Sequence, residues 1–244
     1  GAATAGSVTV SANVVQPQDL TPENQARVAG RPVYDLTITA GGRTVSDFGG
    51  GTATVTVPYT LKPGEDPDAV VVWFLADDGS LQSVNGRYDA ATGQVTFTTS
   101  HFSEFVIGYN LVAFDDVPND AWYRPAVTFI AARGITTGVG DGMYGPEQTL
   151  TRGQFLVLLL RAYGIQPDAG GDAGVGSAAS GGSMVGSAAS SDREPFVNFA
   201  DAGDTWYTGY LAVAKRLGIA TGIGDNLYAP ERSISRQDMF TLLY

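Results

Sequence analysis

Residues 122–160 read WYRPAVTFIAARGITTGVGDGMYGPEQTLTRGQFLVLLL, and residues 206–244 read WYTGYLAVAKRLGIATGIGDNLYAPERSISRQDMFTLLY. The two stretches align without a gap after a shift of 84 residues, and 14 of the 39 aligned positions are identical. Self-similarity at this level predicts a repeat architecture. A unit of two short helices cannot bury its apolar face alone, so we expect neighbouring repeats to pack together.

Each copy has the pattern of two helices joined by a glycine-rich loop. In the first copy, residues 123–133 have helical periodicity, and Pro125 lies in the first turn, where a missing N–H is harmless. Gly134 is a suitable stop for this helix. Residues 155–163 form the second expected helix, and the intervening residues 136–145 are rich in glycine. These features predict an all-α region after residue 110.

The second helix of each copy has a start signal. Thr151 and Gln154 have the spacing of a capping box, in which each side chain bonds the backbone N–H of the other residue. Ser235 and Asp238 repeat this spacing, with Asp in place of the usual Glu or Gln. We therefore expect helices to begin directly after Thr151 and after Ser235.

The pattern of the first 110 residues predicts β structure rather than helices. Residues 7–15 and 34–39 alternate apolar and polar positions, and residues 70–75 are a continuous apolar run that is typical of a fully buried strand. Residues 16–31 lack a clear period and are interpreted as a loop with one helical turn. Seven or more short strands separated by turns are typical of an all-β sandwich. The other expected strands are residues 43–45, 52–59, 81–84, 94–99 and 104–109.

A low-complexity stretch separates the two copies. Residues 166–195 are rich in Gly, Ser and Ala, and they contain Gly-Ser-Ala-Ala-Ser twice. Such a composition cannot bury enough apolar surface to offset its chain entropy, which predicts a flexible linker. The chain is therefore expected to be multidomain: an all-β sandwich (1–110), a first helical repeat (111–165), the linker (166–195) and a second helical repeat (196–244).

Composition excludes several classes of partner and site. The net charge is −11 and no cluster of Lys and Arg exists, which argues against nucleic-acid binding. The absence of cysteine excludes disulfides and cysteine-based metal sites. No apolar run approaches the ~20 residues that span a bilayer, so no membrane insertion is expected. No signal peptide is visible, so an exported chain would be a mature fragment.

Together, the repeated motifs resemble the S-layer homology (SLH) repeat. They are Phe-x-Asp-Val, a Trp, a helix ending in Gly-Ile, then Thr-Gly, Gly-Asp, Tyr-x-Pro and Thr-Arg, over about residues 111–165 and 196–244. The resemblance implies three repeats in a pseudo-threefold helical assembly, whose grooves bind secondary cell-wall polysaccharide, often with ketal-linked pyruvate. It implies an extracellular protein at a bacterial cell wall. Residues 95–110 resemble β modules that precede such repeats, which implies a spacer.

The same resemblance suggests which residues bind the polysaccharide. A Thr-Arg-Ala-Glu motif supplies an arginine to the groove, and by position that role falls to Arg152, after Thr151, and to Arg236, after Ser235. Both copies lack the Glu of the motif. An arginine can meet a pyruvyl carboxylate with two parallel hydrogen bonds, and the start of a helix adds to the attraction. Surface ion pairing is the alternative role for both arginines.

Six further residues complete the predicted polysaccharide site, and two of them, Thr151 and Ser235, directly precede the arginines. Trp122 and Trp206 offer faces for sugar stacking, although packing in a core is the more common role of a large aromatic side chain. Gly138 and Gly222 lie in the glycine-rich loops, where tight-turn geometry also explains them. Because only two repeats are present, the missing third could come from another copy of the chain by self-association.

Other chemistry is poorly supported. The single histidine, His101, has no Gly-x-Ser-x-Gly elbow to complete a hydrolase site. The loop from residue 138 to 142 lacks the Gly-Lys-Ser/Thr ending of a phosphate-binding loop. A cluster with the wrong spacing for an EF-hand is explained by capping and turn formation: Asp115, Asp116, Asn119 and Asp120. We therefore expect no catalytic residue, metal or cofactor.

The sequence thus predicts non-catalytic anchoring of a surface protein to cell-wall polysaccharide. Three other functions stay open at this point. The β-sandwich could be an adhesin or another binding module that the repeats merely tether. The chain could belong to an enzyme that processes polysaccharide, in which case two facing carboxylates should line a cleft. It could also be a purely structural tail without any groove beside the two arginines.

Overall fold

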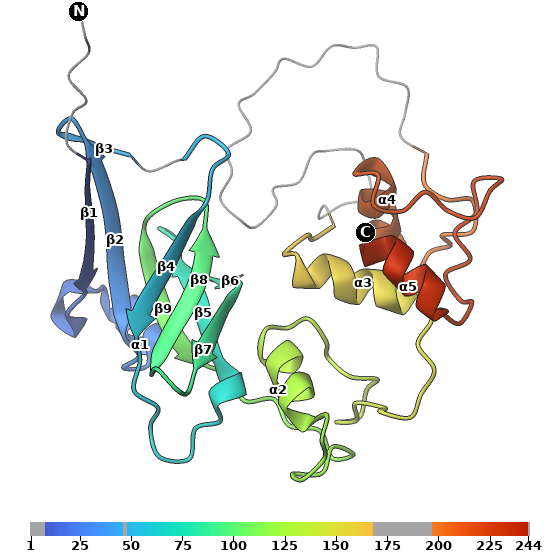
Figure 1. Ribbon diagram of the computed structural model, residues 1–244, viewed down its shortest axis with the longest axis horizontal. Helices are drawn as coiled ribbons and strands as arrows, with labels where there is room; N and C mark the ends of the chain where they lie inside the picture. The colour runs from blue at the N-terminus through green and yellow to red at the C-terminus, as the bar shows by residue number, and fades with distance from the viewer. Residues whose placement is uncertain (1–7, 46–47, 168–196, 244) are drawn as a thin grey trace, which may run out of the picture. The chain divides into compact units, whose positions relative to one another are not determined.

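The computed structural model describes residues 8–45, 48–167 and 197–243 (Figure 1). Contacts divide these residues into two compact units. The predicted linker lies almost entirely outside the described residues. Grouping by contacts does not test the limits of the four predicted domains, which stay a prediction. Unit 1 comprises residues 8–45, 48–113 and 119–133, and unit 2 comprises residues 114–118, 134–167 and 197–243.

Unit 1 contains two antiparallel sheets. The larger sheet has the order β1 (Val8–Val14), β2 (Val33–Ala40), β9 (Glu104–Tyr109), β5 (Val70–Leu75) and β6 (Leu81–Val84), and the short β3 (Arg43–Thr44) pairs with β2. The smaller sheet has the order β4 (Ala53–Pro58), β8 (Gln94–Thr99) and β7 (Gly86–Asp89).

The two sheets share one apolar core. Leu36 of β2 and Ile107 of β9 in the larger sheet pack with Val57 of β4 and Phe97 of β8 in the smaller one. Alternate residues of β8 are buried, as expected for a strand with one face on the core. The continuous apolar run of β5 was predicted to be buried, and this is confirmed because its residues face two different clusters.

The prediction of β structure in the first 110 residues fits the two sheets, and helical segments cover the other face of the larger sheet. The segment containing η1 (Pro17–Asp19) and α1 (Pro22–Val28) packs there through Leu20 and Val28. Beside it, α2 (Arg124–Ala132) packs on η2 (Pro67–Ala69) and β5. The sequence predicted one helical turn within residues 16–31 and a helix over residues 123–133, but not that both segments pack on this sheet.

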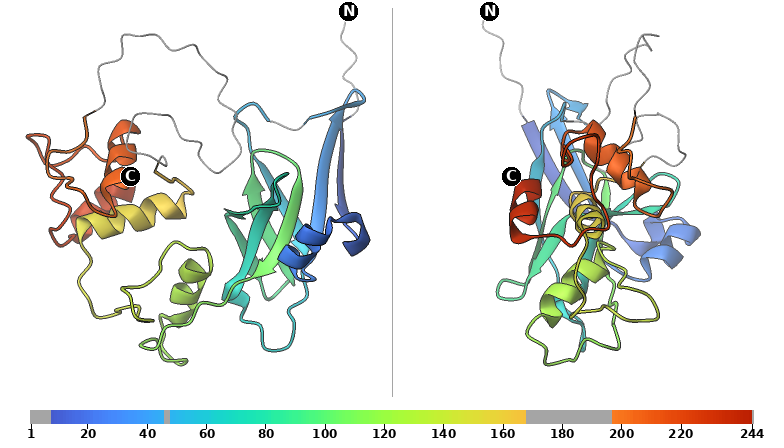
Figure 2. Two further views of the ribbon diagram at one scale, coloured as in Figure 1. Left: turned by 180° about the vertical axis from the view of Figure 1, so that it is seen from behind. Right: turned by 90° about the vertical axis from the view of Figure 1, so that its right-hand side faces the viewer.

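Unit 2 is organised around α3 (Arg152–Ala162), which packs against α4 (Thr208–Arg216) and α5 (Arg236–Leu243) (Figure 2). The core includes Leu156 and Leu160 of α3 with Leu211 of α4, all almost fully buried. None of the helices described in either unit is long and apolar enough to cross a membrane.

The prediction of an all-α region after residue 110 is wrong. Long loops separate the helices. Within these loops, isolated β-bridges pair Gly140 with Met143 and Gly224 with Leu227. Residues with positive φ, which helices cannot contain, recur along these loops. The glycines that marked the repeat in the sequence therefore specify shaped loops rather than tight connections between helices.

Candidate functional site

The predicted capping box at the start of α3 is confirmed. The Oγ1 of Thr151 accepts the backbone N–H of Gln154 at 3.2 Å, and the Oε1 of Gln154 accepts the N–H of Thr151 at 3.0 Å. These bonds satisfy two donors that a helix start otherwise leaves unpaired. They also fix the backbone of Arg152, the first residue of the helix.

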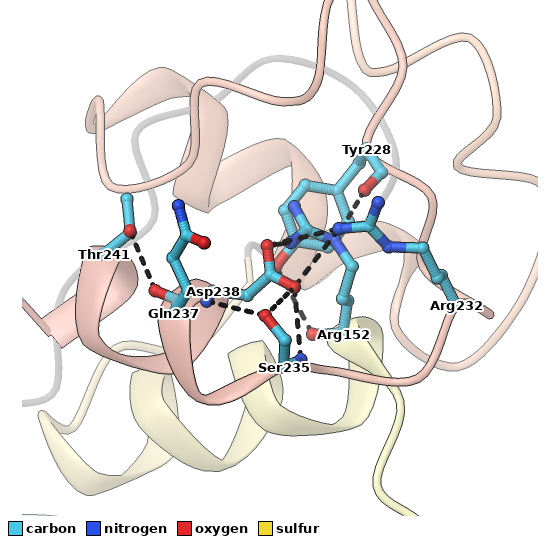
Figure 3. Close-up of polar contacts among 7 residues, drawn as sticks. All are labelled: Arg152, Tyr228, Arg232, Ser235, Gln237, Asp238 and Thr241. Carbon is cyan, nitrogen blue, oxygen red and sulfur yellow. Dashed lines mark hydrogen bonds and ion pairs between the residues drawn. The ribbon is translucent and has the colours of Figure 1, made fainter.

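Arg152 is buried rather than displayed on the surface, with 5% of its area exposed. Its Nε donates to the carbonyl of Tyr228 at 3.0 Å, and its Nη1 donates to Oδ1 of Asp238 at 2.6 Å (Figure 3). The guanidinium carbon lies 4.8 Å from the centre of the Tyr228 ring. A buried charge is tolerated only when it is paired and hydrogen-bonded, and both conditions hold here.

The chain before α5 is bonded to the start of α3. The backbone N–H of Arg152 donates to the carbonyl of Arg232 at 2.9 Å, and that of Gly153 donates to the carbonyl of Pro230 at 2.9 Å. A Cβ on Gly153 would lie 3.2 Å from Pro230, so glycine permits this close approach. The guanidinium of Arg152 is thereby held against residues of the second repeat.

Asp238 has two roles in this arrangement. Its Oδ2 accepts the Oγ–H and the N–H of Ser235, and its own N–H donates back to Ser235 Oγ at 3.1 Å, which confirms the second capping box. It also pairs with Arg152 and, at 3.2 Å, with Arg232. The bonds from Ser235 and these two positive charges lower the pKa of Asp238 to about 2. The sequence predicted the cap but not the ion pairs.

Arg236 does not share this environment. Its side chain is exposed, and within the described residues it makes no recorded hydrogen bond or ion pair. The two arginines that the repeat made equivalent therefore differ in burial and in partners.

A cavity of about 620 Å³ opens beside Arg152 within unit 2. It lies between the C-terminal half of α3, the loop after α4 and one face of α5. Arg152 and Asp238 form its polar end with Gln237 and Thr241, and the Oγ1–H of Thr241 donates to the Gln237 carbonyl (Figure 3). Aliphatic side chains form much of its wall: Leu159, Leu160, Ile165, Leu217, Ile219, Ile223, Leu242 and Leu243.

Of the other predicted site residues, only Gly222 lies on this wall. Gly138 and Gly222 have φ of +76° and +82°, and a Cβ would lie 2.2 Å from the Met143 carbonyl oxygen or 2.4 Å from that of Leu227. Both loops therefore require glycine at this position. Tight-turn geometry explains these two residues without a ligand.

Two aspartates hold the loops in the same way in both copies. Asp116 accepts the N–H groups of Tyr144 and of the next residue at 2.7 and 2.8 Å, and Asp201 accepts those of Tyr228 and of the next residue at 2.9 and 2.7 Å. The bond from Tyr144 lowers the pKa of Asp116. The equivalence is hidden in the sequence because the two spacings differ by one residue. Across the described residues, no cluster of three potential metal ligands is present.

The tryptophans are not core residues, so the packing expectation is wrong. Trp122 is 90% exposed and Trp206 is 59% exposed. Each ring meets the following tyrosine edge to face, with ring centres 5.6 Å apart at Tyr123 and 5.4 Å apart at Tyr207. Tyr207 is buried in the core of unit 2, so the tyrosine takes the place that we expected for the tryptophan.

His101 lies among aromatic rings in unit 1. Its ring centre is 4.7 Å from that of Phe74 and 5.9 Å from that of Phe105. These contacts give the histidine a packing role at the core of the two sheets.

Comparison with known proteins agrees with the repeat analysis. A family model described as the S-layer homology domain matches residues 113–156 and 198–240. An amylopullulanase of Thermoanaerobacterium thermosulfurigenes is 28% identical over 76% of this chain and 9% of its own length. An S-layer protein of Bacillus thuringiensis subsp. finitimus is 27% identical over 54% of the chain and 13% of its own length. An endo-1,4-beta-xylanase A of Thermoanaerobacterium saccharolyticum is 30% identical over 52% of the chain and 9% of its own length.

These matches cover only a small part of each relative. The chain spans about a tenth of the length of the curated relatives it matches. The match to the amylopullulanase is longer than the part of the chain from residue 113 onward, so it includes part of the β-rich region of unit 1. The similarity therefore covers one small portion of each of these much longer proteins.

Proposed function

Because this chain carries two S-layer homology domains and comes from a bacterial cell-surface protein, we propose that it anchors that protein non-covalently to a cell-wall polysaccharide. Two of the relatives bear the names of enzymes and one is an S-layer protein, while the similarity covers a small share of each. A shared portion attached to such different proteins is best explained by a shared attachment role. We therefore assign a non-catalytic, anchoring function to this chain.

The cavity beside Arg152 is the observation that carries the polysaccharide proposal. Its volume lies in the ordinary range for small-molecule sites, and the aliphatic part of its wall suits the apolar faces of sugar rings. A guanidinium carries five N–H donors, and the recorded bonds of the Arg152 side chain to other described residues use two of them. The remaining donors suit an acceptor that enters the cavity.

The local charge favours an anionic substituent. Arg152 and Arg232 together carry one more charge than Asp238 neutralises. In a chain of net charge −11, such a local excess is needed to attract an anion. A carboxylate, such as that of ketal-linked pyruvate, is the substituent that we propose. Self-association to supply a third repeat stays a prediction.

Retention on isolated cell-wall sacculi tests this proposal. Arg152→Lys keeps a positive charge for Asp238 but loses the planar fork, so we expect retention to fall by ~10-fold while the fold is kept. Arg236→Ala is the matched control and should bind like the wild type. Sacculi stripped of their secondary polysaccharide should retain none of the three proteins. Wild-type retention of a folded Arg152→Lys variant would remove the cavity from the proposal.

A further inference from the structure

Helix α2 belongs to the first S-layer homology match, but its contacts are with the β module, here defined as residues 8–45 and 48–110. At the start of the helix, Arg124 pairs with Asp66 at 2.9 Å. At its end, Nδ2 of Asn110 donates to the carbonyl of Ala132 at 2.7 Å, which satisfies one of the acceptors that a helix end leaves open. Both termini of α2 are thus bonded to the β module.

Apolar packing adds to these bonds at the C-terminal end of α2. Ala132 of α2 is 3% exposed and lies in one buried cluster with Ala69 of η2 and Val71 of β5. Val71 points to the opposite face of the larger sheet from Val70 and Val72, which face the core between the sheets. The continuous apolar character of β5 therefore has a specific cause, since its outer face is covered by α2 at Val71 and by the segment containing η1 and α1 at Leu75.

Arg133, directly after α2, makes the most specific contact. Its Nη2 donates to the carbonyls of Gly86 at 2.7 Å and Val70 at 2.9 Å, and its Nη1 donates to that of Asp68 at 3.2 Å. The guanidinium carbon lies 3.4 Å from the centre of the Phe129 ring. Burial lowers the pKa of Arg133 to about 10. This charge is accommodated by three carbonyls from two segments, residues 68–70 and Gly86, which are adjacent only when the β module is folded.

In the described part of the second repeat, this contact has no counterpart. The residue that aligns with Arg133 is Leu217, which is 55% exposed and lies on the wall of the cavity. Helix α4, which aligns with α2, packs instead into the core of unit 2 through Leu211 and Ala214. The two aligned helices therefore pack against different partners. Arg133 makes contacts with the β module that Leu217, at the aligned position, does not make.

We propose that the β module is the N-terminal cap of the repeat array, on which α2 folds and is locked by Arg133. Terminal units of repeat proteins need such a cap, because their outer apolar face has no neighbouring repeat. The module is then more than a spacer, because a force applied to it is transmitted through these contacts to α2, the first helix of the repeats. This inference goes beyond attachment to the wall and does not depend on which glycan is bound.

Hydrogen exchange of the full chain, read by segment, tests whether α2 folds with the β module. Val72→Ala weakens the core between the sheets, on the face away from α2, and Leu211→Ala weakens the core of unit 2. We expect Val72→Ala to speed exchange of the α2 amides by ~10-fold, in step with β5 and β9. Leu211→Ala should speed exchange in α3 and α4 and leave α2 unchanged. An α2 that responds to Leu211→Ala as strongly as to Val72→Ala overturns the proposal.

The role of Arg133 needs its own variants. Arg133→Leu installs the residue of the second repeat and should speed exchange of α2 by ~10-fold while β8, in the smaller sheet, stays protected. Arg133→Lys should restore only part of the protection, since an ammonium cannot reach all three carbonyls. Leu217→Ala is the matched control and should leave α2 unchanged. Unaltered protection of α2 in the folded Arg133→Leu variant would show that Arg133 does not lock it.

Discussion

The two repeats share a loop but differ in what surrounds it. In both, a glycine with positive φ passes close to a backbone carbonyl, and an aspartate accepts two backbone N–H groups. Outside the loop the copies diverge, because α2 packs on the β module and α4 packs on α3. The repeat motif therefore specifies a loop, while residues outside the loop determine which elements pack around it.

The arginines show the same divergence. Arg152 is paired with Asp238 of the second repeat, whereas Arg236 is exposed and has no recorded side-chain partner in the described chain. A single repeat therefore cannot build the site beside Arg152, since the next repeat supplies the carboxylate. Variants at aligned positions can therefore separate the features that the two repeats share from those that they do not.

The largest effect is expected from the shared loop glycines. Gly138→Ala and Gly222→Ala each place a Cβ within 2.4 Å of a carbonyl oxygen at positive φ, so each should cost about 3 kcal/mol. Gly218→Ala also has positive φ but meets no atom within 4 Å, so it should cost only about 1 kcal/mol. Urea denaturation followed by tryptophan fluorescence measures all three. Clearly unequal costs at residues 138 and 222 would break the equivalence of the loops.

The next effect separates the two capping boxes. Asp238→Asn leaves the buried Arg152 without its negative partner, and because Asp238 is 21% exposed we expect a loss of about 2 kcal/mol. Gln154→Ala, at the aligned position, removes only a cap and should cost about 1 kcal/mol. The same denaturation experiment compares them. Equal losses would mean that the ion pair adds nothing to the cap.

Acid should reveal the same difference. The pKa of Asp238 is lowered in the folded chain to about 2, so its bonds stabilise the fold above about pH 4. This contribution should be lost as the pH falls from about 4 through 2, because the carboxylate must then take up a proton. The stability of Asp238→Asn should be less dependent on pH across that range. A variant with the wild-type slope would assign the acid sensitivity to other carboxylates.

These differences mark what the sequence could and could not predict. The bounds of β5, β6, β8 and β9 were predicted correctly, because apolar patterns and turn residues are local signals. The strand β7 (Gly86–Asp89) was not among the predicted strands, since its four residues have no apolar pattern and are recognised as a strand only by their pairing with β8.

The candidate site shows the same limit. Both capping boxes are encoded over four residues and were predicted, but the partner of Arg152 lies 86 residues away in the chain. The burial expected for Trp122 and Trp206 was wrong, because the burial of a residue at a helix start depends on which element packs over it. In this fold, the adjacent tyrosine of the second repeat occupies the core instead.

The smallest effect on stability is expected at the tryptophans. Trp122→Ala should change the free energy of unfolding by less than about 0.5 kcal/mol because the side chain is 90% exposed, and Trp206→Ala, 59% exposed, by about 1 kcal/mol. If both rings stack on sugars, each variant should also lose roughly 3-fold in retention on sacculi. Large exposed aromatics at aligned positions in two repeats are costly to keep without a ligand or a neighbour. Unchanged retention in both variants would exclude sugar stacking and leave contact with a neighbouring repeat as their role.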